Sequence, residues 1–300
     1  MKKKTYLFVL MAMVLTLGSC SDNENGIGGE TSKYITVSTS IGNMTRVATD
    51  EKGGQTFEEG DEISVYAWTG DATVAPETRE RVVNNAINKL TNGSWISNPQ
   101  MLWKNNRDKH YFIGVYPISA ISDLSAGEYT FDETKQVESD LLVAVNKDGL
   151  SYNVDEQQPV PLTFTHVMAK LVVNLTYKNQ WGGIPTVEKV VVGNAAKEAT
   201  INYLTKVVTP STTAKEDFSL PEITENTKYV SVIIPQEDVK QLTIVIGGKN
   251  FVYDNGTPFK LESGKITTVN LEVGRDEIKL GDVKITNWED GSTFSGEALN

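Results

Sequence analysis

Apolar and polar residues alternate along most of the chain that follows residue 33. In residues 33–41 (KYITVSTSI), Ile35, Val37, Thr39 and Ile41 fall on one face, and the residues between them fall on the other. Alternation with a period of two, bounded by Gly, Asn, Asp or Pro, is typical of a half-buried β-strand. The same pattern predicts strands in residues 61–68, 109–117, 169–177, 266–274 and 282–288, and a hairpin in residues 241–254 with its turn at 247–250. Many short strands with few helices predict an all-β protein of the sandwich type.

Residues 77–90 (ETRERVVNNAINKL) have a different spacing. Their apolar positions recur at the intervals of one face of an α-helix, at Val82, Val83, Ala86, Ile87 and Leu90. Asparagines and β-branched residues in the same stretch lower its helix propensity. The spacing therefore predicts a helix here, with a strand as the alternative for its second half.

A polar stretch divides the strand-rich part of the chain. In residues 149–164 (GLSYNVDEQQPVPLTF), Pro159 and Pro161 flank Val160, and the sequence then becomes strongly apolar. Polar segments with proline are typical of boundaries between domains. The sequence predicts an N-terminal domain over residues 34–165 and a C-terminal domain over residues 166–300, each large enough for a core of its own.

The first nineteen residues have the order of a secretory signal peptide. Three lysines at positions 2–4 precede an apolar run from Tyr6 to Leu17 and two small residues. Cys20 follows, the only cysteine of the chain, and the ending Leu17-Gly18-Ser19-Cys20 resembles a bacterial lipobox. That resemblance implies cleavage before Cys20 and acylation of its thiol and its new amine, since two acyl chains anchor a protein stably. The alternative is an ordinary signal peptide with an incidental cysteine.

Residues 20–33 are expected to form a flexible lipidated tether because they contain almost no apolar side chains. Their acidic run, residues 21–24 (SDNE), resembles the surface-export signal of Bacteroidales lipoproteins. The whole chain has a formal net charge of −11, and removing a signal peptide with three lysines and no acidic residue changes it to about −14. Such an acidic protein is a poor partner for nucleic acid or an anionic membrane surface.

The sequence offers no constellation of catalytic or metal-ligating residues. Its two histidines, His110 and His166, lie in separate strand-like runs, and His166 is expected to be a packed residue. Adjacent acidic residues such as Glu58 and Glu59 point to opposite faces of a strand, which does not suit a glycosidase pair. We therefore expect neither an enzyme nor a cofactor or metal, and a glycoside hydrolase with scattered carboxylates stays a distant alternative.

Several blocks of the sequence, in this order and spacing, are similar to the fimbrillins, the type V pilin subunits of Bacteroidales. The blocks are the lipobox, MTRVA (44–48), FEEGDEISVYAW (57–68), residues 93–117 (GSWI to GVYP), SDLLVAV (139–145), VPLTFTHVMAKLVVNL (160–175) and VKITNWEDG (283–291). The resemblance covers nearly the whole chain. It implies a strand through residues 87–96, which argues against the helix considered above.

The resemblance implies two tandem transthyretin-like β-sandwich domains after the lipoprotein signal peptide. It also implies a route of assembly, in which the subunit reaches the outer membrane as a lipoprotein, anchored through Cys20. An Arg-specific or trypsin-like protease then cuts after an arginine behind the first strand, which here is the bond between Arg46 and Val47. The displaced strand, residues 34–46, would take Ile35, Val37 and Ile41 out of the core, and a strand from another subunit would fill the groove.

The implied product is a structural and adhesive subunit of surface fimbriae. Its partners would be other fimbrial subunits and ligands on host or bacterial surfaces. Three alternatives stay open from the residues. Arg46 could be an uncleaved loop arginine of an anchor or tip subunit. The tail has one good strand, Val283 to Trp288, so a tip or accessory role is as open as a stalk role. A surface glycan-binding lipoprotein would use aromatic side chains such as Trp181 as a stacking platform.

Overall fold

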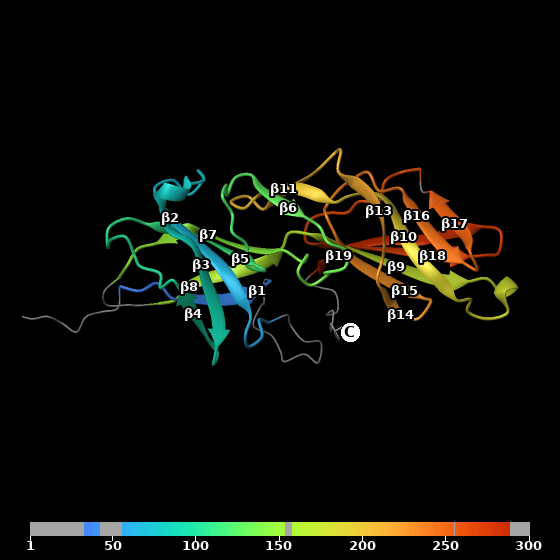
Figure 1. Ribbon diagram of the computed structural model, residues 1–300, viewed down its shortest axis with the longest axis horizontal. Coiled ribbons are helices and arrows are strands. Elements are labelled where there is room, and N and C mark those ends of the chain that lie inside the picture. The colour runs from blue at the N-terminus through green and yellow to red at the C-terminus, as the bar shows by residue number, and fades with distance from the viewer. Residues whose placement is uncertain (1–32, 43–55, 154–157, 255, 289–300) are drawn as a thin grey trace, which may run out of the picture. The chain divides into compact units, whose positions relative to one another are not determined.

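The computed structural model describes residues 33–42, 56–153, 158–254 and 256–288 of the 300-residue chain, and these residues are almost entirely β-structure (Figure 1). In these ranges, the only helices are two short 3₁₀ turns, η1 (Thr78–Glu80) and η2 (Asn179–Trp181). The all-β prediction is confirmed. The described residues contain no helix that is both long and apolar enough to span a membrane.

One seven-stranded sheet dominates the first half of the described chain. Its spatial order is β1-β8-β7-β5-β2-β3-β4. The strands, in that order, are β1 (Val37–Ile41), β8 (Val160–His166), β7 (Leu142–Leu150), β5 (His110–Tyr116), β2 (Glu62–Thr69), β3 (Arg81–Thr91) and β4 (Ser94–Asn98). All neighbours are antiparallel except β1 and β8, which run parallel.

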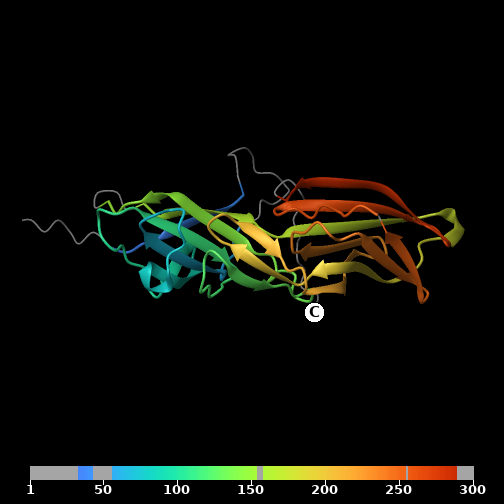
Figure 2. The ribbon, with the colours of Figure 1, turned by 90° about the horizontal axis from the view of Figure 1, so that it is seen from above.

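The second half contains a five-stranded and a four-stranded sheet. The five-stranded order is β14 (Glu222–Thr224), β15 (Lys228–Ile233), β9 (Ala169–Tyr177), β18 (Lys265–Val273) and β19 (Ile278–Asn287). The four-stranded order is β13 (Lys215–Ser219), β10 (Val187–Ala196), β16 (Gln241–Ile246) and β17 (Lys249–Asp254). In Figure 2, β18 and β19 (red) run beside β9 (yellow-green).

A three-stranded sheet joins strands from both sides of residue 165. Its order is β12 (Val207–Pro210), β11 (Glu198–Asn202) and β6 (Gly127–Thr130), so β6 pairs with a strand that follows it by about seventy residues. The apolar core also continues across residue 165, from Tyr66 and Ile113 to Val173 and Val269. The described residues, 33–288 with their gaps, belong to one compact unit. The division into two domains at residue 165 stays a prediction.

The helix predicted for residues 77–90 is wrong. Residues 81–91 form β3, which pairs with β2 on one side and β4 on the other. The register of the β2–β3 pair shifts between Val65 and Trp68, and Asn85 has a φ of 54°. These bulges interrupt the period of two, because an extra residue turns the following side chains to the other face. The apolar positions of a bulged strand therefore fell at helix-like intervals.

The hairpin of residues 241–254 is confirmed, with a shorter turn than predicted. Only Gly247 and Gly248 lie between the strands, with φ of 57° and 71°. Two consecutive residues with positive φ form the turn whose twist matches that of the flanking strands. Lys249 and Asn250 therefore belong to β17.

β2 lies between two cores, which is why six consecutive residues of this strand are buried and not alternate ones. Ile63, Val65 and Ala67 face the core that also contains Ile35 and Val37 of the first strand. Tyr66 and Trp68 face the core that continues into the second half. The strand predicted for residues 61–68 is confirmed as β2, and the second core explains why its other face is also apolar.

A row of small residues in the seven-stranded sheet makes room for one aromatic ring. Across the sheet, Phe164 pairs with Ala144, Ala144 with Gly114, and Gly114 with Val65. A Cβ atom at Gly114 would lie 2.6 Å from Cζ of the buried Phe164 ring. The Phe164 ring can therefore occupy this position because residue 114 has no side chain.

His110 is a buried structural residue at the start of β5. Its Nε2 accepts a hydrogen bond from the Lys104 backbone N–H at 3.1 Å, so Nδ1, 3.1 Å from the Asp108 carbonyl oxygen, carries the proton. The ring of Trp103 packs edge-on against it. Burial lowers the pKa of His110. The imidazole is therefore neutral in the folded protein near pH 7.

We predict that Gly114→Ala destabilises the protein by about 1–3 kcal/mol, because the new methyl group overlaps the Phe164 ring. Urea unfolding measures the change in the free energy of unfolding. The double variant Gly114→Ala, Phe164→Leu should recover part of the loss, since the two single changes share one space. Additive effects of the two substitutions would contradict the packing described here.

We also predict that stability falls as the pH is lowered from 7.5 to 5.5. His110 binds a proton more readily in the unfolded chain than in the folded protein, so the free energy of unfolding rises with pH in this window, by at most about 1.4 kcal/mol per pH unit for one proton. His110→Asn, which keeps an N–H donor but does not titrate, should reduce this slope. An unchanged slope would show that other groups cause the pH dependence.

Candidate functional site

The first strand holds its place in the sheet through one neighbouring strand. β1 pairs in parallel with β8, from Val37 opposite Val160 to Ile41 opposite Phe164. Just outside the two ends of β1, the Val160 N–H donates to the Thr36 carbonyl and the Gly42 N–H donates to the Phe164 carbonyl, both at 2.8 Å. Within the described residues, β8 is the only strand that forms a ladder with β1. β1 is thus an edge strand.

The residues before β1 have a second, shorter set of contacts. The Ile35 N–H donates to the Met101 carbonyl at 2.9 Å, and the Trp103 N–H donates to the Lys33 carbonyl at 3.1 Å. Further along, the indole Nε1 of Trp95 donates to Oγ1 of Thr39 at 3.0 Å. Backbone hydrogen bonds therefore hold the first strand on both sides at its start. Further along, the outer edge of β1 has one side-chain hydrogen bond, at Thr39, among the described residues.

The alternation predicted for residues 33–41 is confirmed. Ile35 and Val37 are 2% and 6% exposed, while Thr36, Ser38 and Ser40 face solvent. Ile41 is half-buried and packs against the same core. Covering Ile35 and Val37 stabilises the fold by about 1.5–3 kcal/mol for each side chain. Loss of the first strand would uncover this part of the core.

Aromatic rings close the core beneath the end of β1. Phe57 packs edge-on against Phe164, Trp95 and Tyr116, with ring centroids 5.1, 5.3 and 5.4 Å away. Burial raises the pKa of Tyr116 to about 12, so its hydroxyl stays protonated and donates to Oδ1 of Asp61 at 3.3 Å. None of these rings belongs to β1, but two of them contact it, because Phe164 lies in the neighbouring β8 and Trp95 donates to Thr39.

The residues predicted for lipidation and processing lie outside the described part of the chain. This applies to Cys20 and to the pair Arg46 and Val47. β1 ends at Ile41, five positions before Arg46, and the described chain resumes at residue 56. Their roles stay predictions.

The last described strand, β19, forms one edge of the five-stranded sheet. Among the described strands it pairs with β18 alone, and none of its residues is fully buried. Val283 pairs with the buried Val269, and Ile285 pairs with the buried Thr267, yet their own side chains are 40% and 39% exposed. β19 therefore carries an incompletely covered apolar face beside a free edge.

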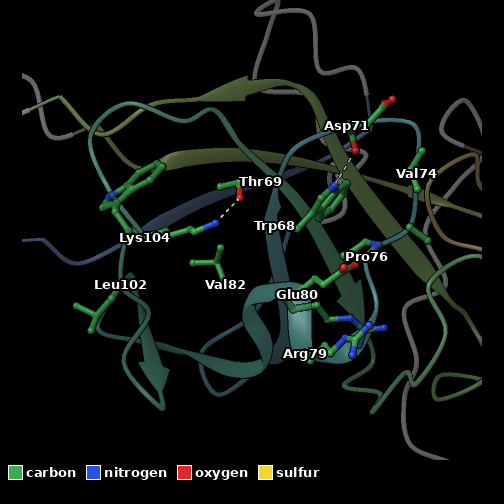
Figure 3. Close-up of a pocket in the computed structure, with 13 residues that line it drawn as sticks. Trp68, Thr69, Asp71, Val74, Pro76, Arg79, Glu80, Val82, Leu102 and Lys104 are labelled. Carbon is green, nitrogen blue, oxygen red and sulfur yellow. Dashed lines mark hydrogen bonds between the residues drawn. The ribbon is translucent and has the colours of Figure 1, made fainter.

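A pocket with a volume of about 790 Å³ lies at the end of β2 (Figure 3). Several of its polar side chains have partners within the chain, although the buried Nε of Arg81 has none among the described residues. The Trp68 Nε1 donates to the Asp71 carbonyl at 2.9 Å, and the Lys104 Nζ donates to Oγ1 of Thr69 at 3.2 Å. Arg79 pairs with Glu77 at 2.9 Å. Among the described residues, these contacts occupy polar groups that would otherwise be available to a small ligand.

The described residues hold no group of three or more His, Cys, Asp and Glu that could bind a metal ion. His166 is packed, as predicted, with its Nδ1 2.7 Å from Oδ1 of Asp140. Trp181, the suggested glycan platform, donates from Nε1 to the Val273 carbonyl at 2.9 Å. Its ring packs against Phe251, and the Arg275 guanidinium lies 5.7 Å from its centroid. The indole is thus used in packing.

Sequence reasoning missed the residues that receive the first strand. β8 was expected to contain a domain boundary, and nothing local indicated its parallel pairing with residues 37–41. Trp95 and Met101, which bind β1 from the other side, had no distinguishing pattern. The contact of Trp288 with His166, whose rings stack 4.1 Å apart, was also missed. The position of Trp288 at the end of the last apolar strand was the one signal in the sequence for a buried contact there.

Comparisons with known proteins match this architecture. A sequence model of one protein family, described as fimbrillin-like, matches residues 45–288. A protein named as fimbrium subunit Fim1C, from Bacteroides uniformis, is 24% identical over 316 aligned positions that cover 97% of each chain.

Two solved structures share the fold. A protein described as a cell adhesion protein, from Bacteroides uniformis, superposes with a TM-score of 0.64 at 19% identity, over 86% of this chain and all of that one. A fimbrial protein from Bacteroides vulgatus gives a TM-score of 0.53 at 12% identity, over 84% of this chain and 99% of that one. The family match covers most of the residues, and the resemblance found in the sequence is confirmed: the chain belongs to the fimbrillin-like family.

Proposed function

We propose that this protein is a structural and adhesive subunit of cell-surface fimbriae and that it joins its neighbours by strand exchange. In this proposal, a strand of another subunit takes the place of β1 after the first strand has been removed. Membership in the fimbrillin-like family supports assembly with other fimbrial subunits. The fimbrium subunit Fim1C, with which it aligns over 97% of its length, supports the same role.

The observation that carries the proposal is the mismatch between the burial of β1 and its pairing. Ile35 and Val37 are buried in a core that includes Val65 and Phe112, although the strand has one ladder partner. Removing the strand would expose apolar side chains and unpaired backbone groups of β8. An incoming strand that alternates in the same way would restore both, which gives exchange its driving force.

We propose that processing follows export as a lipoprotein. Acyl chains on Cys20 would hold the precursor at the outer membrane, facing the cell exterior. Cleavage between Arg46 and Val47 would then free residues 20–46 from the rest of the subunit. The polar, glycine-containing sequence of residues 47–55 supports protease access, because cleavage requires an exposed segment.

We propose β19 as the strand that is donated to the next subunit. It is an edge strand with one partner, and Val283 and Ile285 supply apolar side chains two residues apart, the spacing also found at Ile35 and Val37. The half-exposed side chains of β19 would become buried in the groove of another subunit. This gain would offset the loss of the β18–β19 ladder.

The first prediction uses the chain from Cys20 to Asn300 with Cys20→Ser, treated with a trace of trypsin. We expect a cut after Arg46, identified by intact mass, followed by oligomers in gel filtration that resist SDS. The variant Arg46→Ala is the matched control, and it should stay monomeric under the same treatment. Cleavage at Arg46 without oligomers would limit the protein to a tip role, and resistance at Arg46 would contradict the processing step.

The second prediction concerns the uncut chain. Ile35→Ala should lower the free energy of unfolding by about 2–5 kcal/mol, because it leaves a cavity in the core under β1. Ser38→Ala, on the exposed face of the same strand, should change it by less than about 0.5 kcal/mol. Once the first strand is cut away, oligomers of Ile35→Ala and of the unchanged protein should be equally stable. A difference between them would show that residue 35 remains in the assembled subunit.

A further inference from the structure

Trp288 is a buried residue at the end of an exposed strand. No residue of β19 (Ile278–Asn287) is fully buried, whereas Trp288, which follows it directly, is 2% exposed. The Trp288 N–H donates to the Gly264 carbonyl at 3.0 Å. The last strand is therefore held at its end by one large side chain, and along its length by the ladder to β18.

The seat of Trp288 is built from charged and titratable side chains of other strands. Its indole stacks on the His166 ring with 4.1 Å between centroids and 6° between planes. The Lys170 Nζ lies 4.2 Å from the indole centroid, and Oδ1 of Asp140 lies 2.7 Å from Nδ1 of His166. Burial lowers the pKa of Lys170 to about 8. A cation over an indole face is an attractive contact, more so where water is excluded.

The same seat contains an unsatisfied polar atom. The indole Nε1 of Trp288 is buried and has no hydrogen-bond partner among the residues that the structure describes. A buried N–H without an acceptor costs free energy that solvent exposure or a new acceptor would return. Trp288 is therefore buried, but the unpaired indole N–H makes its buried position less stable.

His166 connects this seat to the first strand. It is the last residue of β8, two positions after Phe164, which pairs with Ile41 and accepts the hydrogen bond of the Gly42 N–H. β8 thus pairs with β1 along its length and holds Trp288 at its end. Loss of β1 would leave β8 as the new edge of the seven-stranded sheet, which loosens the residue that supports the indole.

We propose that Trp288, seated on His166 and Lys170, is a latch that stores β19 on its own subunit and is weakened through β8 when β1 leaves. This inference rests on the proposed strand exchange and adds a way in which that exchange is regulated. Before processing, the latch keeps the donor strand on its own subunit. After processing, acceptor groove and donor strand become available together.

Hydrogen exchange of the uncut Cys20→Ser chain tests the latch without any cleavage. Trp288→Ala should raise amide exchange in β19 at least tenfold. Ile285→Ala, a half-exposed residue of the same strand, is the matched control and should raise it far less. Protection of β5 and β9 in the same sample reports that the variant is folded, and His166→Ala provides a second way to empty the seat. Equal effects of Trp288→Ala, His166→Ala and Ile285→Ala would overturn the latch.

The coupling to β1 is tested in two independent ways. In the uncut chain, Val37→Ala should raise exchange in β19 as well as in β1 and β8, although residue 37 is far from β19 in the sequence. In the unchanged protein cut after Arg46, exchange in β19 should rise toward the level of Trp288→Ala. Unaltered β19 exchange in Val37→Ala would overturn the coupling. If the chain resists cleavage but Val37→Ala behaves as expected, the latch stands and the proposed processing fails.

Discussion

The parallel ladder between β1 and β8 is the interaction on which the first half of the structure depends. It brings Ile35 and Val37 into a core that also contains side chains of β3 and β8, such as Val83 and Leu162. It also makes β8 an interior strand, with β7 on its other side. Loss of this single run of backbone hydrogen bonds would uncover the part of the core beneath Ile35 and Val37. The position of β1 at an edge makes the covering of this core reversible in principle, since no strand has to be pulled from between two others.

The two halves of the protein are joined by more than a linker. β6, from the first half, pairs with β11 of the second, and the Phe131 N–H donates to the Lys197 carbonyl at 2.8 Å. Gln136 accepts a hydrogen bond from the Val232 N–H at 2.7 Å. A core shared by both halves can transmit a change in packing, because close-packed interiors are poorly compressible. The stacking of Trp288 on His166 adds a contact between the residue that follows β19 and the last residue of β8, a strand of the seven-stranded sheet.

The alternation of apolar and polar residues predicted the strands, except where bulges or distant contacts altered the local pattern. The half-buried edge strand of residues 37–41 alternates strictly, so its inward residues were predictable from the sequence. β2 was also predicted as a strand, but not the second core that buries its Tyr66 and Trp68, and bulges gave β3 the spacing of a helix. The family resemblance corrected β3 because it supplied the missing long-range context. The partner of β1 and the seat of Trp288 depend on residues more than a hundred positions apart, for which one sequence contains no local signal.

The parallel orientation of β1 and β8 also has a consequence for the order of folding. Ser40 and Thr163, whose hydroxyl groups lie 3.2 Å apart across this ladder, are separated by 123 positions. Contacts between residues so distant along the chain form late, because a long loop must close before they yield any stabilisation. The antiparallel neighbours β2 and β3, by comparison, are joined through a short connection. The first strand to leave the ribosome is thus expected to be among the last to join its sheet, and the sheet that receives it must already be largely organised without it.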